Sequence, residues 1–171
     1  MIARLSVVAL LFVTLLVLQT AVLPALTVGG YRPDLVLLVV VAIAVIDGAE
    51  PGVRVGFVGG LLTDVLLQTS ALGVAALSFS VVGWLVGLAR PYLAPQSLTA
   101  PLLLGFGGSF VGELLLGLLA RVLGGEPAPL RLVIQAAVVV GVVHTLLVPL
   151  ALRVARALSV RFPAEGTAVS R

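Results

Sequence analysis

Short polar stretches divide the chain into six strongly apolar segments, and this pattern limits the folds that are open to it. The segments cover residues 5–28, 35–46, 53–67, 71–89, 101–119 and 130–152. Apolar residue types make up 61% of the chain and charged residues 10%, whereas a soluble domain has about 45–50% and about 25%. A chain of 171 residues cannot bury that much apolar surface in its own core. The pattern therefore predicts an all-α, polytopic integral membrane bundle, and it excludes a soluble globular or disordered protein.

The number of spans depends on the first two segments. The first follows a short stretch that holds Arg4, as a signal peptide would. It is too long for a signal-peptide core and has no A-x-A site near its end, so we expect a retained helix that Pro24 kinks or ends. The second opens with Pro33-Asp34, which is typical of a helix start. Its 12 apolar residues are fewer than the roughly 20 of a full span. We predict six transmembrane helices, with five as the alternative.

Arginine counting gives the expected orientation. With six spans both termini lie on one side, which then holds seven arginines against three on the other: Arg4, Arg54, Arg90, Arg153, Arg156, Arg161 and Arg171 against Arg32, Arg121 and Arg131. The side richer in arginine is normally cytoplasmic. We therefore expect a multi-pass protein with both termini in the cytoplasm.

The polar stretches between the segments are short. Residues 47–52 are typical of a turn, and no stretch is long enough for a soluble domain. We expect one transmembrane bundle over residues 1–152, followed by a basic, disordered cytoplasmic tail over residues 153–171.

Small residues form a stripe on the third segment. Gly52, Gly56, Gly60 and Asp64 are spaced four apart, so they lie on one face of a helix. Such a stripe allows another helix to approach closely. We interpret these four residues as a helix-packing or partner interface. Asp64 would either bind the turn at Thr69 and Ser70 or contact a ligand or partner.

Three further ionisable residues fall within the segments. Arg54, close to the start of its segment, is expected to reach the membrane surface. Glu113 and His144 are expected to make intramembrane polar contacts, because ionisable groups within spans usually face a bundle interior or an interface. Glu113 could pair with His144 or Arg54, or accept a hydrogen bond from Ser109.

The sequence gives little basis for catalysis. The absence of cysteine removes thiolate chemistry, and one histidine is too few for a typical zinc site. Gly107-Gly108-Ser109 with His144 has the residue types of an intramembrane serine protease, but the serine lacks a following glycine. The arginines are spread singly rather than clustered with aromatic residues, so nucleic acid is not an expected partner. We predict a protein that is not an enzyme and holds no cofactor or metal.

The stretch 32–90 resembles the rod shape-determining protein MreD family. The residues that carry the resemblance are Pro33-Asp34, Gly52, Gly56-Phe57, Gly59-Gly60-Leu61-Leu62, Asp64, Leu72-Gly73, Gly83-Trp84-Leu85 and Gly87. The helices of this family resemble those of the substrate-binding subunits of energy-coupling-factor transporters. Trp84 departs from the family pattern, where tyrosine is expected.

The resemblance implies a non-catalytic subunit of the cell-wall elongation machinery. Such a protein sits beside MreC in the bacterial cytoplasmic membrane. It helps couple the MreB cytoskeleton to peptidoglycan synthesis by a glycosyltransferase and a transpeptidase, and so maintains cell shape. A basic tail could also meet anionic membrane lipid.

The alternative is a substrate-binding subunit of an energy-coupling-factor vitamin transporter, or another small solute carrier. That function requires a polar pocket, for which Asp64, Glu113, Gln135 and His144 are the candidates. Aromatic residues make up only 5% of the chain, which is little for a pocket of this kind.

Overall fold

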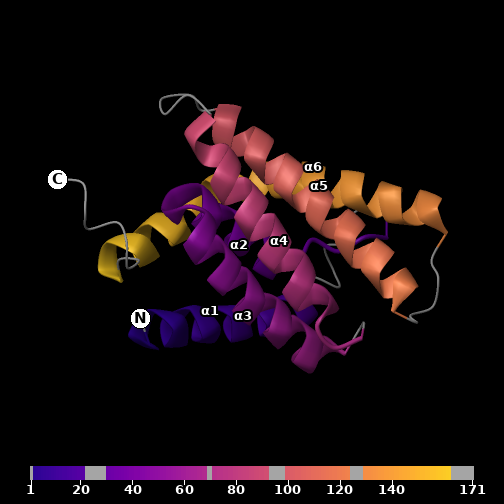
Figure 1. Cartoon of the computed structure of the whole chain (residues 1–171), viewed down its shortest axis with the longest axis horizontal. Helices are drawn as coiled ribbons and strands as arrows, with labels where there is room; N and C mark the ends of the chain where they lie inside the picture. The colour runs from indigo at the N-terminus through magenta and orange to yellow at the C-terminus, as the bar shows by residue number, and fades with distance from the viewer. Residues whose placement is uncertain (1, 22–29, 69–70, 93–98, 124–128, 163–171) are drawn as a thin grey trace.

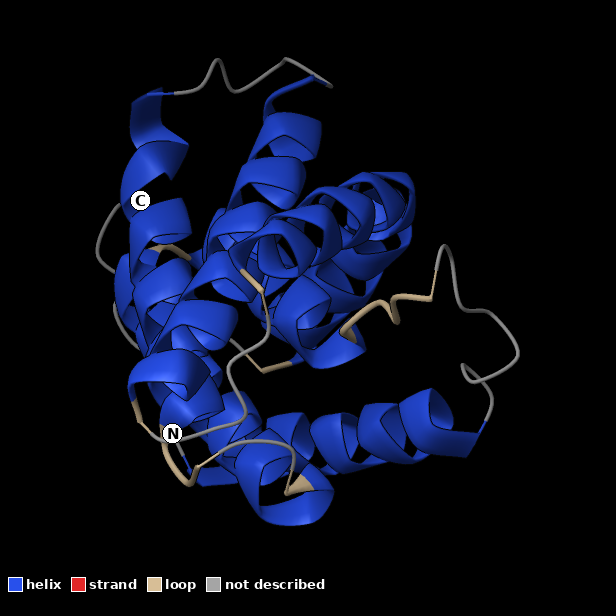
Figure 2. Ribbon diagram, turned by 90° about the vertical axis from the view of Figure 1, so that its right-hand side faces the viewer, coloured by secondary structure: helices blue, strands red, loops and turns tan. Residues whose placement is uncertain are grey.

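The computed structural model describes residues 2–21, 30–68, 71–92, 99–123 and 129–162. Within these ranges the chain forms six α-helices, which are labelled in Figure 1, and one short 3-10 helix. They are α1 (Ile2–Ala21), α2 (Leu35–Asp47), α3 (Ala49–Leu67), α4 (Val74–Ala89), η2 (Arg90–Tyr92), α5 (Thr99–Val122) and α6 (Leu130–Arg161). Figure 2 shows that helices account for most of the described chain. The expected all-α architecture is confirmed.

Four helices are long and apolar enough to cross a membrane. These are α1, α4 with η2, α5 and α6. Helix α2 is apolar but has 13 residues, which at 1.5 Å per residue gives about 20 Å against a hydrocarbon core of about 30 Å. Helix α3 has 19 residues and carries Glu50, Arg54 and Asp64. Six helices are thus present, while the number that cross the membrane stays a prediction.

Helix α2 lies at the centre of the bundle. Nine consecutive residues, from Val36 to Ala44, are buried, and the helix contacts α1, α3, α4, α5 and α6. A helix enclosed on all sides needs no polar face, which explains its continuous run of Val, Leu, Ile and Ala. Its start is the one expected, because Asp34 occupies the N-cap position and accepts hydrogen bonds from the backbone N–H groups of Val36 (2.9 Å) and Leu37 (3.0 Å).

The turn between α2 and α3 is shorter than expected. The predicted turn over residues 47–52 is wrong, because α3 already begins at Ala49. Gly48 alone reverses the chain, with φ at 97°, a conformation that glycine adopts without steric cost. Pro51 is compatible with the first turn of α3, since backbone N–H groups there have no partner within the helix.

Helix α6 is longer than expected. It continues to Arg161, so residues 153–161 are helical and not the start of a disordered tail. Ala155 and Leu158 in this extension are buried against the bundle, and this burial explains why the helix persists past its apolar run. The remaining tail, residues 163–171, lies outside the described residues, as does Pro24.

Candidate functional site: buried polar contacts and helix interfaces

The glycine stripe of α3 packs against α4. A Cβ atom added at Gly52 would lie 2.5 Å from the carbonyl oxygen of Gly83, and one at Gly56 or Gly60 would meet the backbone of Phe79 or Ala75 even more closely. Backbone atoms cannot move aside as a flexible side chain can. The three glycines therefore set the distance between α3 and α4, and this face of α3 is occupied within the chain itself.

Asp64, at the end of the same stripe, binds the start of α4. Its side chain accepts hydrogen bonds from the backbone N–H groups of Gly73 (3.0 Å), Ala75 (3.1 Å) and Ala76 (3.1 Å). The residue is only 3% exposed. A carboxylate at a helix N-terminus satisfies N–H groups that lack a partner in the helix and meets the positive end of the helix dipole. Asp64 is thus a hydrogen-bond acceptor, as expected, and the groups that it binds lie at the start of α4. Thr69 and Ser70, the partners expected from the sequence, lie outside the described residues.

His144 and Ser109 form a buried hydrogen bond between α6 and α5. The His144 Nδ1 to Ser109 Oγ distance is 2.7 Å, and both side chains are fully buried. The second ring nitrogen of His144, Nε2, is buried and has no hydrogen-bond partner among the described residues. A hydrogen bond between a serine and a histidine is the arrangement of a nucleophile and its base. The full burial of both side chains is equally the environment of a packing hydrogen bond between two helices.

Glu113 is a half-buried residue of α5 that lies near the start of α2. Its neighbour Gly112 faces Leu37 in the first turn of α2. Among the described residues Ser109 bonds His144, and Arg54 pairs with Glu50 one turn earlier in α3. The expected contacts of Glu113 stay a prediction. Asp34 itself lies before the first turn of α2. Its burial raises the pKa of its carboxyl group to about 6, and the hydrogen bonds from the N–H groups of Leu37 and Val36 offset part of this rise.

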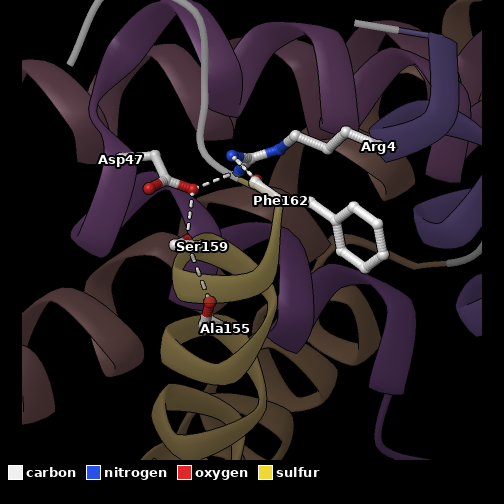
Figure 3. A network of polar contacts seen from close by, with 5 residues as sticks. All are labelled: Arg4, Asp47, Ala155, Ser159 and Phe162. Carbon is white, nitrogen blue, oxygen red and sulfur yellow. Dashed lines mark hydrogen bonds and ion pairs between the residues drawn. The ribbon is translucent and has the colours of Figure 1, made fainter. Parts of the chain in front are cut away.

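A polar network at the opposite end of α2 was not anticipated from the sequence (Figure 3). The buried carboxylate of Asp47 forms an ion pair with Arg4 of α1 and accepts a hydrogen bond from the hydroxyl of Ser159 in α6 (2.9 Å). Arg4 also donates to the carbonyl oxygen of Phe162 (2.8 Å). Asp47 reads as an ordinary turn acid in the sequence, and only the length of α6 brings Ser159 to it. The network joins the two ends of the described chain.

The residues considered for a polar substrate pocket do not converge. Asp64 binds the start of α4, His144 binds Ser109, and Gln135 is exposed on α6. No group of three or more His, Cys, Asp or Glu side chains that could hold a metal ion occurs in the described part of the chain.

Two apolar grooves run along the outside of the bundle. One, of about 200 Å³, lies between α4 and α5. The other, of about 450 Å³, lies between α5 and α6. Their walls are residues such as Val86, Leu104 and Leu146, and such walls suit hydrocarbon better than a polar solute.

Together the apolar helices and their internal polar bonds define a multi-pass helical membrane protein. The family model of the rod shape-determining protein MreD matches residues 1–120, a stretch that contains α1 to α4 and nearly all of α5. The chain therefore belongs to the MreD family, as the sequence motifs indicated. No curated protein and no solved structure matches the chain significantly. The expected likeness to energy-coupling-factor transporter subunits stays a prediction.

Proposed function

We propose that this chain is a non-catalytic subunit of the complex that directs cell-wall elongation, and that it sits beside an MreC-like protein in the bacterial cytoplasmic membrane. There it helps couple an MreB-type cytoskeleton to a glycosyltransferase and a transpeptidase of peptidoglycan synthesis. The observation that carries the proposal is the family match over residues 1–120. Membership of this family indicates a role in rod shape determination.

The internal use of polar groups supports a scaffold role. Asp64, Ser109 and Asp47 each bind another helix of the same chain. Large apolar side chains remain exposed along α4, among them Leu77, Trp84 and Leu88, each about half exposed. A rigid bundle with an apolar outer surface is suited to contacts with lipid and with the helices of other membrane proteins.

The glycine stripe and Asp64 enter this proposal indirectly. Because Gly52, Gly56 and Gly60 face α4, a partner helix does not reach them while α3 and α4 are packed together. We propose that the stripe and Asp64 support complex assembly by fixing the α3–α4 pair, whose outer surface the partner contacts.

Cytoplasmic termini are also part of the proposal. The bond from Arg4 to Phe162 joins the two ends of the described chain at one end of the bundle, and this supports the proposal because an even number of spans puts both termini on one side. The excess of arginines on that side supports its cytoplasmic location.

The experiment is depletion of the chain in its own bacterium, followed by complementation. Cells without it are expected to lose their rod shape, and the unaltered chain is expected to restore it. The Ser109→Ala variant is also expected to restore the shape, because the proposal gives its hydroxyl no chemical step. A Ser109→Ala chain that is folded and inserted but fails to restore the shape would contradict the non-catalytic role, and depleted cells that keep their shape would contradict the proposal itself.

A further inference from the structure

The groove between α5 and α6 is open on one side and apolar. Its volume is about 450 Å³, and it is lined by Thr99, Leu102, Leu103, Phe106, Val142, Thr145 and Leu146. Leu103 is 65% exposed and Leu146 77% exposed. The hydroxyl of Thr145 donates to the carbonyl oxygen of Gly141 in its own helix (2.8 Å), so it does not need a polar ligand. Both walls belong to helices that can cross a membrane.

One end of this groove leads to two arginines. Arg153 follows Leu146 by seven residues, so it lies on the same face of α6 about 10 Å further along. Arg156 follows one turn later, and both arginines are exposed. The helices are antiparallel, because Gly105 packs on Val148 and Gly117 packs on Val133. The start of α5, which opens the groove, therefore lies at the same end of the bundle as the arginines.

Among the described residues, the carboxylates at this end are already bound. Asp47 is bound by Arg4 and Ser159, and Glu50 pairs with Arg54. Neither Arg153 nor Arg156 forms an ion pair with a described residue. A surface that combines an apolar groove with exposed arginines at one end matches a molecule with a hydrocarbon chain and an anionic headgroup.

We propose that the α5–α6 groove binds one acyl chain of an anionic phospholipid, whose phosphate is held by Arg153 and Arg156. The charge favours this occupant over a zwitterionic lipid. The position of the arginines at the end of α6 favours an anionic lipid over a transmembrane helix, because an apolar helix has no anionic group for the arginines to bind. Juxtamembrane arginines attract anionic lipid by about 1 kcal/mol each, so each arginine is expected to contribute roughly fivefold to the preference.

The test places a fluorescent reporter in the groove and uses lipids whose acyl chains quench it. Trp84 is the sole tryptophan of the chain, so the full-length protein with Trp84→Phe and Leu146→Trp carries one reporter. Brominated-chain phosphatidylglycerol and brominated-chain phosphatidylcholine are titrated into the protein in mild detergent. The mole fraction that gives half-maximal quenching is measured for each lipid, and Leu103→Trp gives a second reporter on the opposite wall.

Half-maximal quenching is expected at an at least fivefold lower mole fraction of the phosphatidylglycerol. Arg153→Gln combined with Arg156→Gln is expected to abolish the preference. The control is Arg131→Gln, which removes one positive charge, as Arg153→Gln alone does, from an exposed position at the other end of α6, and it should preserve the preference.

Three results would overturn the proposal. Equal quenching by both lipids would mean an ordinary lipid-facing surface. A preference that survives loss of Arg153 and Arg156 would place the anionic site elsewhere. A reporter that neither lipid quenches in the complex extracted from native membranes, but that both quench once the chain is isolated, would assign the groove to a partner helix.

Discussion

Asp64 shows how much of the architecture depends on one side chain. Its two oxygens accept three backbone N–H groups from the start of α4, and almost none of it is exposed. Asp64 therefore defines how the end of α3 meets the beginning of α4.

Replacing Asp64 should destabilise the bundle. Asp64→Ala leaves three N–H groups without their acceptor, and an expected loss of about 2 kcal/mol or more follows from the usual values for a helix cap and for unsatisfied buried donors. Asp64→Asn retains one acceptor oxygen and should lose less. Thermal unfolding in mild detergent, followed by circular dichroism, measures both. Glu50→Ala, at an exposed acid of α3, is the control, and a loss in that control equal to that of Asp64→Ala would contradict the assignment.

The Ser109–His144 hydrogen bond makes a second prediction at this scale. Ser109→Ala and His144→Ala should each destabilise the protein, and the double variant should lose less than the sum of the two. Hydrogen bonds between membrane helices average about 0.6 kcal/mol and reach about 1.7 kcal/mol, so we expect a coupling energy in this range. A double-mutant cycle on unfolding free energy measures it. Strictly additive losses would show that the contact contributes nothing to stability.

At the level of helices, the backbones of α3 and α4 approach each other closely. Gly52 faces Gly83, and Gly60 faces Ala75, backbone against backbone. The four-residue spacing of these glycines predicts such an approach from the sequence alone. The identity of the opposing helix does not follow from the spacing, because a glycine stripe fits any helix that can come close.

Glycine replacements separate packing from helix propensity. Gly56→Ala and Gly60→Ala each place a methyl group against the backbone of α4, so they should lose about 1–3 kcal/mol of unfolding free energy, as overpacked sites do. Gly107→Ala is the matched control in α5, since no atom lies within 4 Å of the added carbon. It should be neutral or stabilising by up to about 1 kcal/mol because alanine favours helix. Equal effects at all three sites would contradict the packing account.

The limits of sequence reasoning also appear at the level of helices. The start of α2 was predictable because Pro33-Asp34 acts locally. The start of α3 and the end of α6 were not. Two charged residues, a proline and a glycine give the beginning of α3 the composition of a loop, and the last turns of α6 are held by burial of Ala155 and Leu158 against distant helices. Local patterns do not report contacts of that kind.

At the scale of the whole molecule, one polar network joins helices α1, α2 and α6. Arg4, Asp47 and Ser159 come from α1, α2 and α6, and Phe162 follows α6 (Figure 3). These positions are up to 158 residues apart in the chain. The sequence offered no signal for this contact, because each residue is unremarkable in its own segment.

Removing one partner of the Arg4–Asp47 ion pair should strongly destabilise the bundle. Asp47→Ala leaves the largely buried guanidinium of Arg4 without its counter-ion, and removal of one partner of a buried pair typically loses about 3–5 kcal/mol. Arg4→Met combined with Asp47→Leu removes both charges and should lose less than Asp47→Ala alone. Unfolding in detergent is again the measurement. A double variant that is as unstable as the sum of its single variants would contradict a specific pair.

The central claim concerns the assembly in which the bundle works. The most direct measurement is affinity purification of the tagged chain from its own membranes in mild detergent, with the co-purifying proteins identified. The proposed function predicts recovery of an MreC-like protein together with wall synthases. Recovery of ATP-binding-cassette ATPases and a coupling subunit, without an MreC-like protein, would contradict the proposed function and indicate a transporter instead.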